Sequence, residues 1–174
     1  SLTGVLGSEV DMEMSLPRAV TLSGYHELND SLALMANLAW EDWSEFGRVG
    51  ITLNSATSRS FQQDRNLKDT WHVALGGRYR YRSNWILSAG LAYDSSPMDD
   101  ADRTIDLPLD RQIRVGIGAE YEKRDDFVLG FSYVYLDAGD ADVDQTGGPL
   151  SGDIKGEFDR NAVHFFNVNV RWRF

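Results

Sequence analysis

Five cationic side chains are the residues of this chain best suited to binding a charged group. They occupy the polar positions of segments in which polar and apolar residues alternate: His72, Arg78, Arg80, Arg114 and Arg171. An arginine can hold a carboxylate through two parallel N–H···O bonds, so an apolar slot ending at such a side chain suits an amphipathic anion. These residues are therefore candidates for binding the head group of a hydrophobic ligand.

The same cations could instead complete a structural network. A polar interior has to pair its charges, and opposite charges on adjacent strands stabilise a sheet. Five carboxylates at polar positions are available as partners: Glu9, Asp11, Glu13, Glu41 and Glu120. We expect this network to be the main role of the cations, with head-group binding as the alternative.

Other site chemistry has little support. The three histidines do not cluster, there is no cysteine, and neither Gly-x-Ser-x-Gly nor His-Glu-x-x-His occurs. The acidic run from Asp140 to Asp144 resembles a calcium loop, but Gln145 stands where glycine is needed. We predict no catalytic residue, no metal site and no cofactor. A net charge of -10 and a pI of about 4.6 argue against nucleic acid as a partner.

The elements that position these cations are predicted from two-residue alternation. Ile113, Val115 and Ile117 alternate with Arg114 and Gly116, so a strand here has one apolar and one polar face. Similar patterns predict about eight strands, at residues 9–16, 18–28, 31–54, 68–82, 85–95, 110–122, 126–138 and 160–174. The third is unusually long, and we expect a bulge near residues 43–45 to interrupt it.

The two faces predict an all-β, antiparallel transmembrane β-barrel. Trp and Tyr fall near the strand ends on the apolar face, as interfacial girdles require. The other face is rich in Gly, Asn, Ser and Arg, which suits a water-filled interior better than the surface of a soluble barrel. The mean hydropathy of -0.37 agrees, because only alternate residues of such a barrel face lipid.

The last strand carries a pattern that predicts the compartment. Phe166, Val168, Val170, Trp172 and Phe174 share one face, and the sequence ends on that aromatic residue. This pattern resembles the C-terminal signal by which outer-membrane barrels are recognised for insertion. We therefore expect a bacterial outer-membrane location, with membrane lipid, lipopolysaccharide and the barrel-assembly machinery as partners. The start of the sequence lacks a signal peptide, so we expect a mature chain or a piece of one.

The connections predict a topology and two ways of completing the barrel. Short turns at 29–30, 83–84 and 123–125 should be periplasmic, and longer loops at 55–67, 96–109 and 138–159 extracellular. If the acidic first strand meets Arg171 and Arg173 of the last, the chain closes as its own eight-stranded barrel. Otherwise the last strand pairs with a strand outside this chain.

Several stretches resemble the C-terminal half of the FadL-type transporters of long-chain fatty acids and hydrocarbons. They are LPRAV at residues 16–20, LAWEDWSEF at 38–46, KDTWHVALG at 68–76, AGLAYDSSP at 89–97 and DRTIDLPLDR at 102–111. The resemblance covers nearly the whole chain. It implies a fourteen-stranded barrel whose early strands and N-terminal hatch are absent here, so that residues 1–174 form a single segment of it.

The resemblance also implies a function, which leaves two alternatives open. The implied function is outer-membrane transport of a hydrophobic small molecule, through a channel of which this chain is part. A small outer-membrane barrel serving as anchor or adhesion scaffold is the first alternative. A hydrolase built into the barrel is the second, although no motif in the sequence indicates an enzyme.

Overall fold

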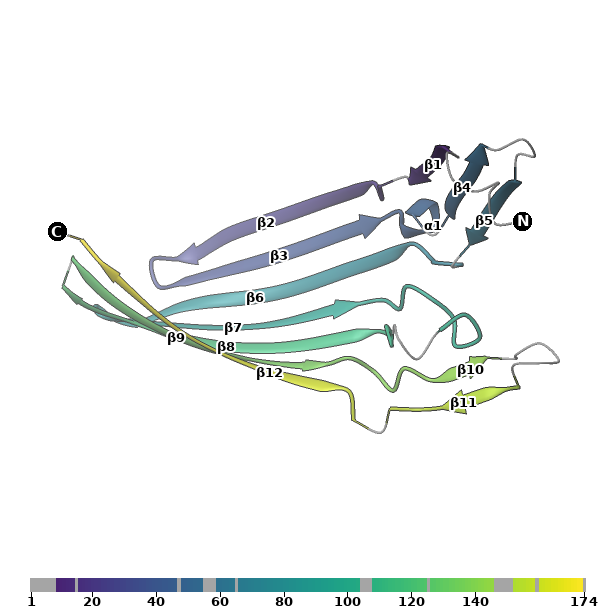
Figure 1. Ribbon diagram of the computed structural model, residues 1–174. Helices are drawn as coiled ribbons and strands as arrows, with labels where there is room; N and C mark the ends of the chain where they lie inside the picture. The colour runs from purple at the N-terminus through teal and green to yellow at the C-terminus, as the bar shows by residue number, and fades with distance from the viewer. Residues whose placement is uncertain are drawn as a thin grey trace.

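The computed structural model describes residues 9–14, 16–46, 48–54, 59–64, 66–103, 108–124, 126–145, 152–158 and 160–173, and most of them lie in antiparallel strands (Figure 1). The strands are β1 (Glu9–Met14), β2 (Ala19–Asn29), β3 (Leu32–Glu41), β4 (Arg48–Asn54), β5 (Arg59–Asp64), β6 (Thr70–Arg82), β7 (Trp85–Asp94), β8 (Gln112–Arg124), β9 (Phe127–Asp137), β10 (Val143–Gln145), β11 (Ile154–Gly156) and β12 (Ala162–Trp172). One short helix, α1 (Trp43–Phe46), follows β3. Within these ranges, no helix has the length and apolar character needed to cross a membrane.

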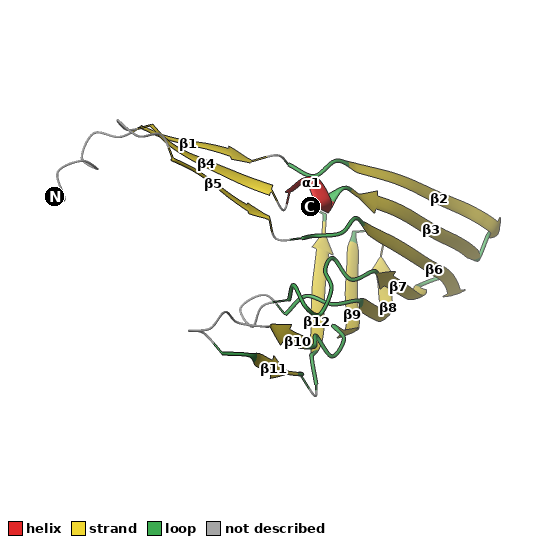
Figure 2. Ribbon diagram, turned by 90° about the vertical axis from the view of Figure 1, so that its right-hand side faces the viewer, coloured by secondary structure: helices red, strands yellow, loops and turns green. Residues whose placement is uncertain are grey.

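The main sheet has seven strands in the order β12-β9-β8-β7-β6-β3-β2, all antiparallel to their neighbours. It is curved, so that the strands form a trough (Figure 2). Its tight turns, the end of β12 and the start of β9 lie at one end, here called the turn end, and its long connections lie at the loop end (Figure 1). The predicted all-β antiparallel class is confirmed, and in the described residues the sheet is open, with β2 and β12 as its edges.

The predicted single strand over residues 31–54 is wrong. Asp42 follows β3 directly and begins α1, because its buried carboxylate accepts hydrogen bonds from Arg18 Nε at 2.8 Å and Ser44 Oγ at 3.1 Å. The backbone N–H of Ser44 is directed at Asp69 Oδ1, 3.3 Å away. These polar contacts favour one helical turn over a bulge. Beyond it, β4 belongs to a second sheet, of order β1-β4-β5.

Of the two ways of completing the barrel, closure of β1 onto β12 is not seen in the described residues. β1 pairs with β4 from Glu9↔Asn54 to Met14↔Val49 and forms the edge of the second sheet, while β12 is an edge of the main sheet. The Arg18–Asp42 ion pair lies where β2 begins and β3 ends, and it holds these two segments together. Beyond it, the segment before β2 and the segment after α1 pair again, as β1 with β4. Residues 55–67 and 138–159, expected to be loops, also contain β5 and the β10–β11 hairpin.

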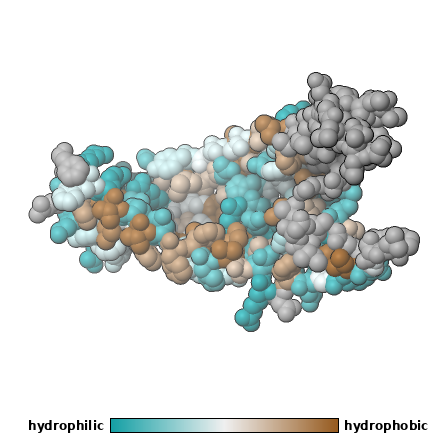
Figure 3. All heavy atoms as spheres, viewed as in Figure 1, coloured by the Kyte–Doolittle hydropathy of each residue, from teal (hydrophilic) through white to brown (hydrophobic). Residues whose placement is uncertain are grey.

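The two faces of the main sheet differ as predicted. The convex face exposes large apolar side chains on every strand, among them Leu22, Leu38, Leu75, Leu91, Ile117, Phe131 and Val168. The concave face carries mainly small and polar residues. Ala33, Ile86 and Val128 are buried there, while Met35 and Phe165 are exposed. Figure 3 shows pale and tan spheres in the middle of the molecule and hydrophilic, teal spheres mainly toward its ends.

Aromatic pairs mark both ends of the main sheet. At the turn end, the rings of Trp85 and Tyr121 lie 4.9 Å apart, and those of Phe127 and Trp172 lie 6.5 Å apart. At the loop end, Trp40 of β3 is in register with Trp71 of β6. Such bands agree with the girdle positions expected from the sequence.

We expect an arginine on the convex face to destabilise the protein far more than one on the concave face. Val115→Arg would place a charge on the exposed apolar surface at mid-height of the sheet, at a cost of about 2 to 4 kcal/mol near the bilayer midplane. Gln112→Arg, on the concave face, is the control and should cost much less. Reversible unfolding in lipid vesicles measures both, and equal losses would contradict the assignment of faces.

The ion pair before α1 should give a pH-dependent contribution to stability. The Arg18 guanidinium, by hydrogen bonding, holds the pKa of the Asp42 carboxyl below its ordinary value of 3.8. A lowered folded-state pKa stabilises the fold above the ordinary pKa, and this stabilisation disappears as the pH falls through the lowered value. Thermal unfolding of wild type and Asp42→Asn should therefore differ at neutral pH and converge in acid; a gap that widens in acid would contradict this.

Candidate functional site

The concave face has a hollow of about 670 Å³ at mid-height of the main sheet, here called the central hollow. Its floor contains Gly76, Gly90 and Gly116, which are in register across β6, β7 and β8. Ala74 and Ala92 form the next row. Its other polar or larger lining residues include Ser23, Tyr25, Met35, Asn37, Ser88, Arg114, Ser132 and Val134. The floor is therefore backbone and methyl groups, with few groups that could bind water.

Of the described residues that line the central hollow, Arg114 is the one with a charged side chain. It lies in the row of Ala74 and Ala92, on the side nearer the loop end. Its Nη2 forms an ion pair with Asp94 Oδ2. The other oxygen of Asp94 lies 2.8 Å from His72 Nδ1. The structure thus brings together two of the five predicted cations, His72 and Arg114, around a shared carboxylate.

The other three predicted cations lie away from this cluster. Arg78 and Arg80 are nearer the turn end, where Arg78 Nη2 is 4.0 Å from Glu120 Oε2 and Arg80 Nη1 is 3.2 Å from Glu122 Oε2. Arg171 is exposed on edge strand β12 and has no ion-pair partner within the described ranges. None of the three lines the central hollow.

Four of the predicted cations lie beside carboxylates, but among the described residues only the pairing of Arg78 with Glu120 joins two residues named from the sequence. Glu41 instead accepts a hydrogen bond from Trp43 Nε1 at 2.6 Å. The side chains of Glu9, Asp11 and Glu13 lie outside the described residues. Asp94 and Glu122 were missed, although both stand at polar positions, and Asp94 is in register with His72.

A second hollow, of about 360 Å³, lies at the loop end beneath α1. Its apolar wall consists of Trp43, Phe46, Leu67, Pro97 and Leu109. Asp94 lines this hollow while its partner Arg114 lines the central one. The ion pair therefore stands where the two hollows approach each other.

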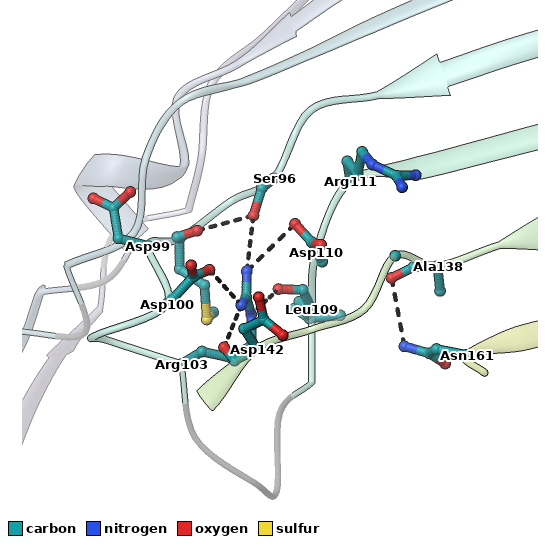
Figure 4. Close-up of polar contacts among 12 residues, drawn as sticks. Ser96, Asp99, Asp100, Arg103, Leu109, Asp110, Arg111, Ala138, Asp142 and Asn161 are labelled. Atoms are coloured by element: carbon teal, nitrogen blue, oxygen red, sulfur yellow. Dashed lines mark hydrogen bonds and ion pairs between the residues drawn. The ribbon is translucent and has the colours of Figure 1, made fainter. Parts of the chain in front are cut away.

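A buried arginine fixes the loop between β7 and β8. The side chain of Arg103 is only 1% exposed, and donates from Nε to the Leu109 carbonyl at 2.8 Å and from Nη1 to Asp100 Oδ1 at 2.7 Å. Nη2 lies 3.3 Å from Asp110 Oδ1, and Nη1 also donates to the Asp142 carbonyl (Figure 4). These contacts join the loop to the segment after β9. Arg103 lies in the stretch 102–111 that resembles the transporter family, but nothing in the sequence indicates its burial.

The acidic segment that resembles a calcium loop is engaged in other contacts. The carbonyl of Asp142 accepts the bond from Arg103, and Asp144 pairs with Lys155 Nζ at 2.8 Å. In the part of the chain that the structure describes, no three His, Cys, Asp or Glu side chains are grouped as metal ligands.

Comparisons with known proteins point to one family. A sequence model of the family described as "Outer membrane protein transport protein (OMPP1/FadL/TodX)" matches residues 2–174. The chain is 27% identical over 163 residues to the long-chain fatty acid transport protein of Escherichia coli K12, which covers 94% of this chain and 35% of that protein. The chain thus spans about a third of that relative.

Solved structures show the same fold. A Pseudomonas aeruginosa FadL homologue superposes with a TM-score of 0.73 at 23% identity, over 94% of this chain and 37% of that one. The CymD monoaromatic hydrocarbon channel superposes with a TM-score of 0.55 at 20% identity, over 76% of this chain and 34% of that one.

Replacing Arg103 by methionine should loosen the loop after β7. The change removes the hydrogen bonds that the guanidinium donates and leaves the partly exposed Asp110 without its cation, which destabilises the loop. Limited proteolysis should cut residues 95–111 about tenfold faster or more, because cleavage follows local opening. The control is Lys68→Met, whose ion pair with Asp99 is half exposed and should matter little. Equal cleavage of both variants would contradict the role of Arg103.

Proposed function

Because the chain belongs to the OMPP1/FadL/TodX family of outer membrane transport proteins, we propose that it forms part of the wall of a channel for hydrophobic compounds. The family places the chain in the bacterial outer membrane, and the related folds are outer-membrane β-barrels. The E. coli relative is a fatty acid transport protein rather than an enzyme, which supports a role without catalysis. The compounds to be carried would be long-chain fatty acids or hydrocarbons.

The central hollow is the observation that carries this proposal. A water-filled barrel interior is normally lined with polar side chains, yet here glycine and alanine form a patch in the middle of the concave wall. Its volume of about 670 Å³ falls within the range of small-molecule sites. An apolar solute could occupy this glycine and alanine patch, which lies between Arg114 on the loop side and Arg78 and Arg80 on the turn side.

The remainder of the barrel would come from strands outside residues 1–174. In a bilayer, unpaired backbone groups at the edges β2 and β12 would each cost several kcal/mol. We therefore propose that this chain is the C-terminal segment of a larger barrel, and that further strands and a hatch belong to the rest of the protein. A closed anchor made from this chain alone does not fit the open main sheet.

The proposed partners follow from the convex face. Its exposed apolar side chains would contact membrane lipid and, at the outer leaflet, lipopolysaccharide. Phe166, Val168, Val170 and Trp172 are exposed along edge strand β12, which suits recognition by the barrel-assembly machinery. Phe174, the last residue of the expected signal, lies outside the described residues.

Filling the central hollow should block transport. Ala74→Trp would place an indole over the glycine floor, and we expect the initial rate of labelled oleate uptake to fall about fivefold or more, because the indole occupies the space of the solute. Uptake would be measured in cells that express the protein from its complete reading frame, in a background lacking other uptake systems.

The matched control is Ala119→Trp. Ala119 pairs with Leu87 on the convex face, where an indole would meet lipid, so oleate uptake should stay close to wild type. Both variants should show the same surface level and the same resistance of the folded protein to detergent. Uptake that is equal in the two variants, or absent from the wild type, would refute the proposed function.

A further inference from the structure

We infer that Arg114 is the residue of this wall that selects for an anionic head group, by exchanging its partner Asp94 for the carboxylate of a hydrophobic ligand. The inference rests on the proposed function and names the ligand class of the central hollow. It also singles out one of the cations on the concave face as the residue that determines specificity.

Position is the first observation. An amphipathic anion needs an apolar surface and a cation beside it. In the central hollow, only Arg114 combines the two, because it stands at the margin of the Ala74, Ala92 and Gly116 floor. Arg78 and Arg80 lie beyond the hollow with their own carboxylates, and Arg171 lies on the sheet edge.

The state of the guanidinium is the second observation. The side chain of Arg114 is 38% exposed, so a ligand can reach it from the hollow. Only Nη2 is bonded to Asp94, and the buried Nε has no acceptor. A planar guanidinium can hold a carboxylate through two parallel bonds, whereas Asp94 binds it through one oxygen. A rotation that brings Nε to a ligand oxygen would satisfy a donor that is now unpaired.

The fate of Asp94 is the third observation. An arginine that leaves a carboxylate normally strands a charge, which makes such exchange costly. Here Oδ1 of Asp94 remains 2.8 Å from His72 Nδ1 after Oδ2 is released. His72 therefore serves as the second partner that makes the exchange possible. The side chain of Asp94 is also 26% exposed, so water can reach this carboxylate after Arg114 is released.

Binding of two probes that differ only in the head group tests the inference. Oleate and methyl oleate would be titrated into the detergent-purified protein expressed from its complete reading frame. Arg114→Met, which keeps the side-chain length and removes the charge, should weaken oleate binding about tenfold or more, since a charged hydrogen bond is lost. Methyl oleate binding should change by less than about twofold, because the apolar floor is untouched.

Three further variants separate this role from a structural one. Arg111→Met is the matched control, because Arg111 is similarly exposed, pairs with Asp137 at 3.3 Å and lies outside the hollow. It should leave both affinities unchanged. Asp94→Asn removes the competing carboxylate and should strengthen oleate binding severalfold. The double variant Arg114→Met with Asp94→Asn removes the stranded charge and should still bind oleate as weakly as Arg114→Met.

The outcomes distinguish this inference from the proposed function. A ratio of oleate to methyl oleate affinity that is the same in wild type, Arg114→Met and the double variant would overturn the role of Arg114 and leave the channel intact. Equal weakening of both probes would show a structural role only, and would also overturn it. Wild-type protein that binds and takes up neither probe would contradict the proposed function itself.

Discussion

The bilayer imposes one constraint on which every other feature of this chain depends: backbone N–H and C=O groups have no water to bind within the hydrocarbon core. The long antiparallel main sheet satisfies these groups, since β3, β6, β7, β8 and β9 are each paired on both sides. Pairing fixes the two-residue alternation, and alternation assigns every side chain to lipid or to the interior. At the two edge strands of the main sheet, β2 and β12, one row of backbone groups has no partner strand in the described residues.

Curvature then determines which residues the concave face can hold. Side chains converge on the inside of a curved sheet, so small residues are required where strands bend most. A Cβ atom built on Gly90 would lie 3.3 Å from the Leu75 carbonyl oxygen, and one on Gly76 would lie 3.4 Å from that of Ala89. The glycine rows therefore serve the shape of the wall, and the apolar central hollow is a consequence of that shape. Structure and candidate site have the same physical origin here.

The strands and faces could be predicted because alternation is a local property. The prediction failed where a polar side chain overrides alternation: Asp42, held by Arg18 and Ser44, ends β3 in spite of the apolar residues that follow. It also failed for partners, since the spacing of Arg114 and His72 in the sequence does not show that Asp94 lies between them. Arg103 lies in a loop where no period exists, so only its burial and contacts reveal it. Family resemblance supplied the larger, fourteen-stranded barrel and the transport role, because alternation alone does not distinguish a channel from an anchor.

The glycine floor of the central hollow has a kinetic consequence. Side chains that line a passage present a series of rotamer-dependent barriers, each of which a moving molecule has to wait for. The backbone of Gly76, Gly90 and Gly116 has no rotamers, so the energy surface over it is smooth. Conduction requires sites that hold a solute weakly enough for it to leave. In the proposed channel, a smooth patch bounded by Arg114 would let the residence time of a solute be set mainly by that charge, and movement across the patch would be fast.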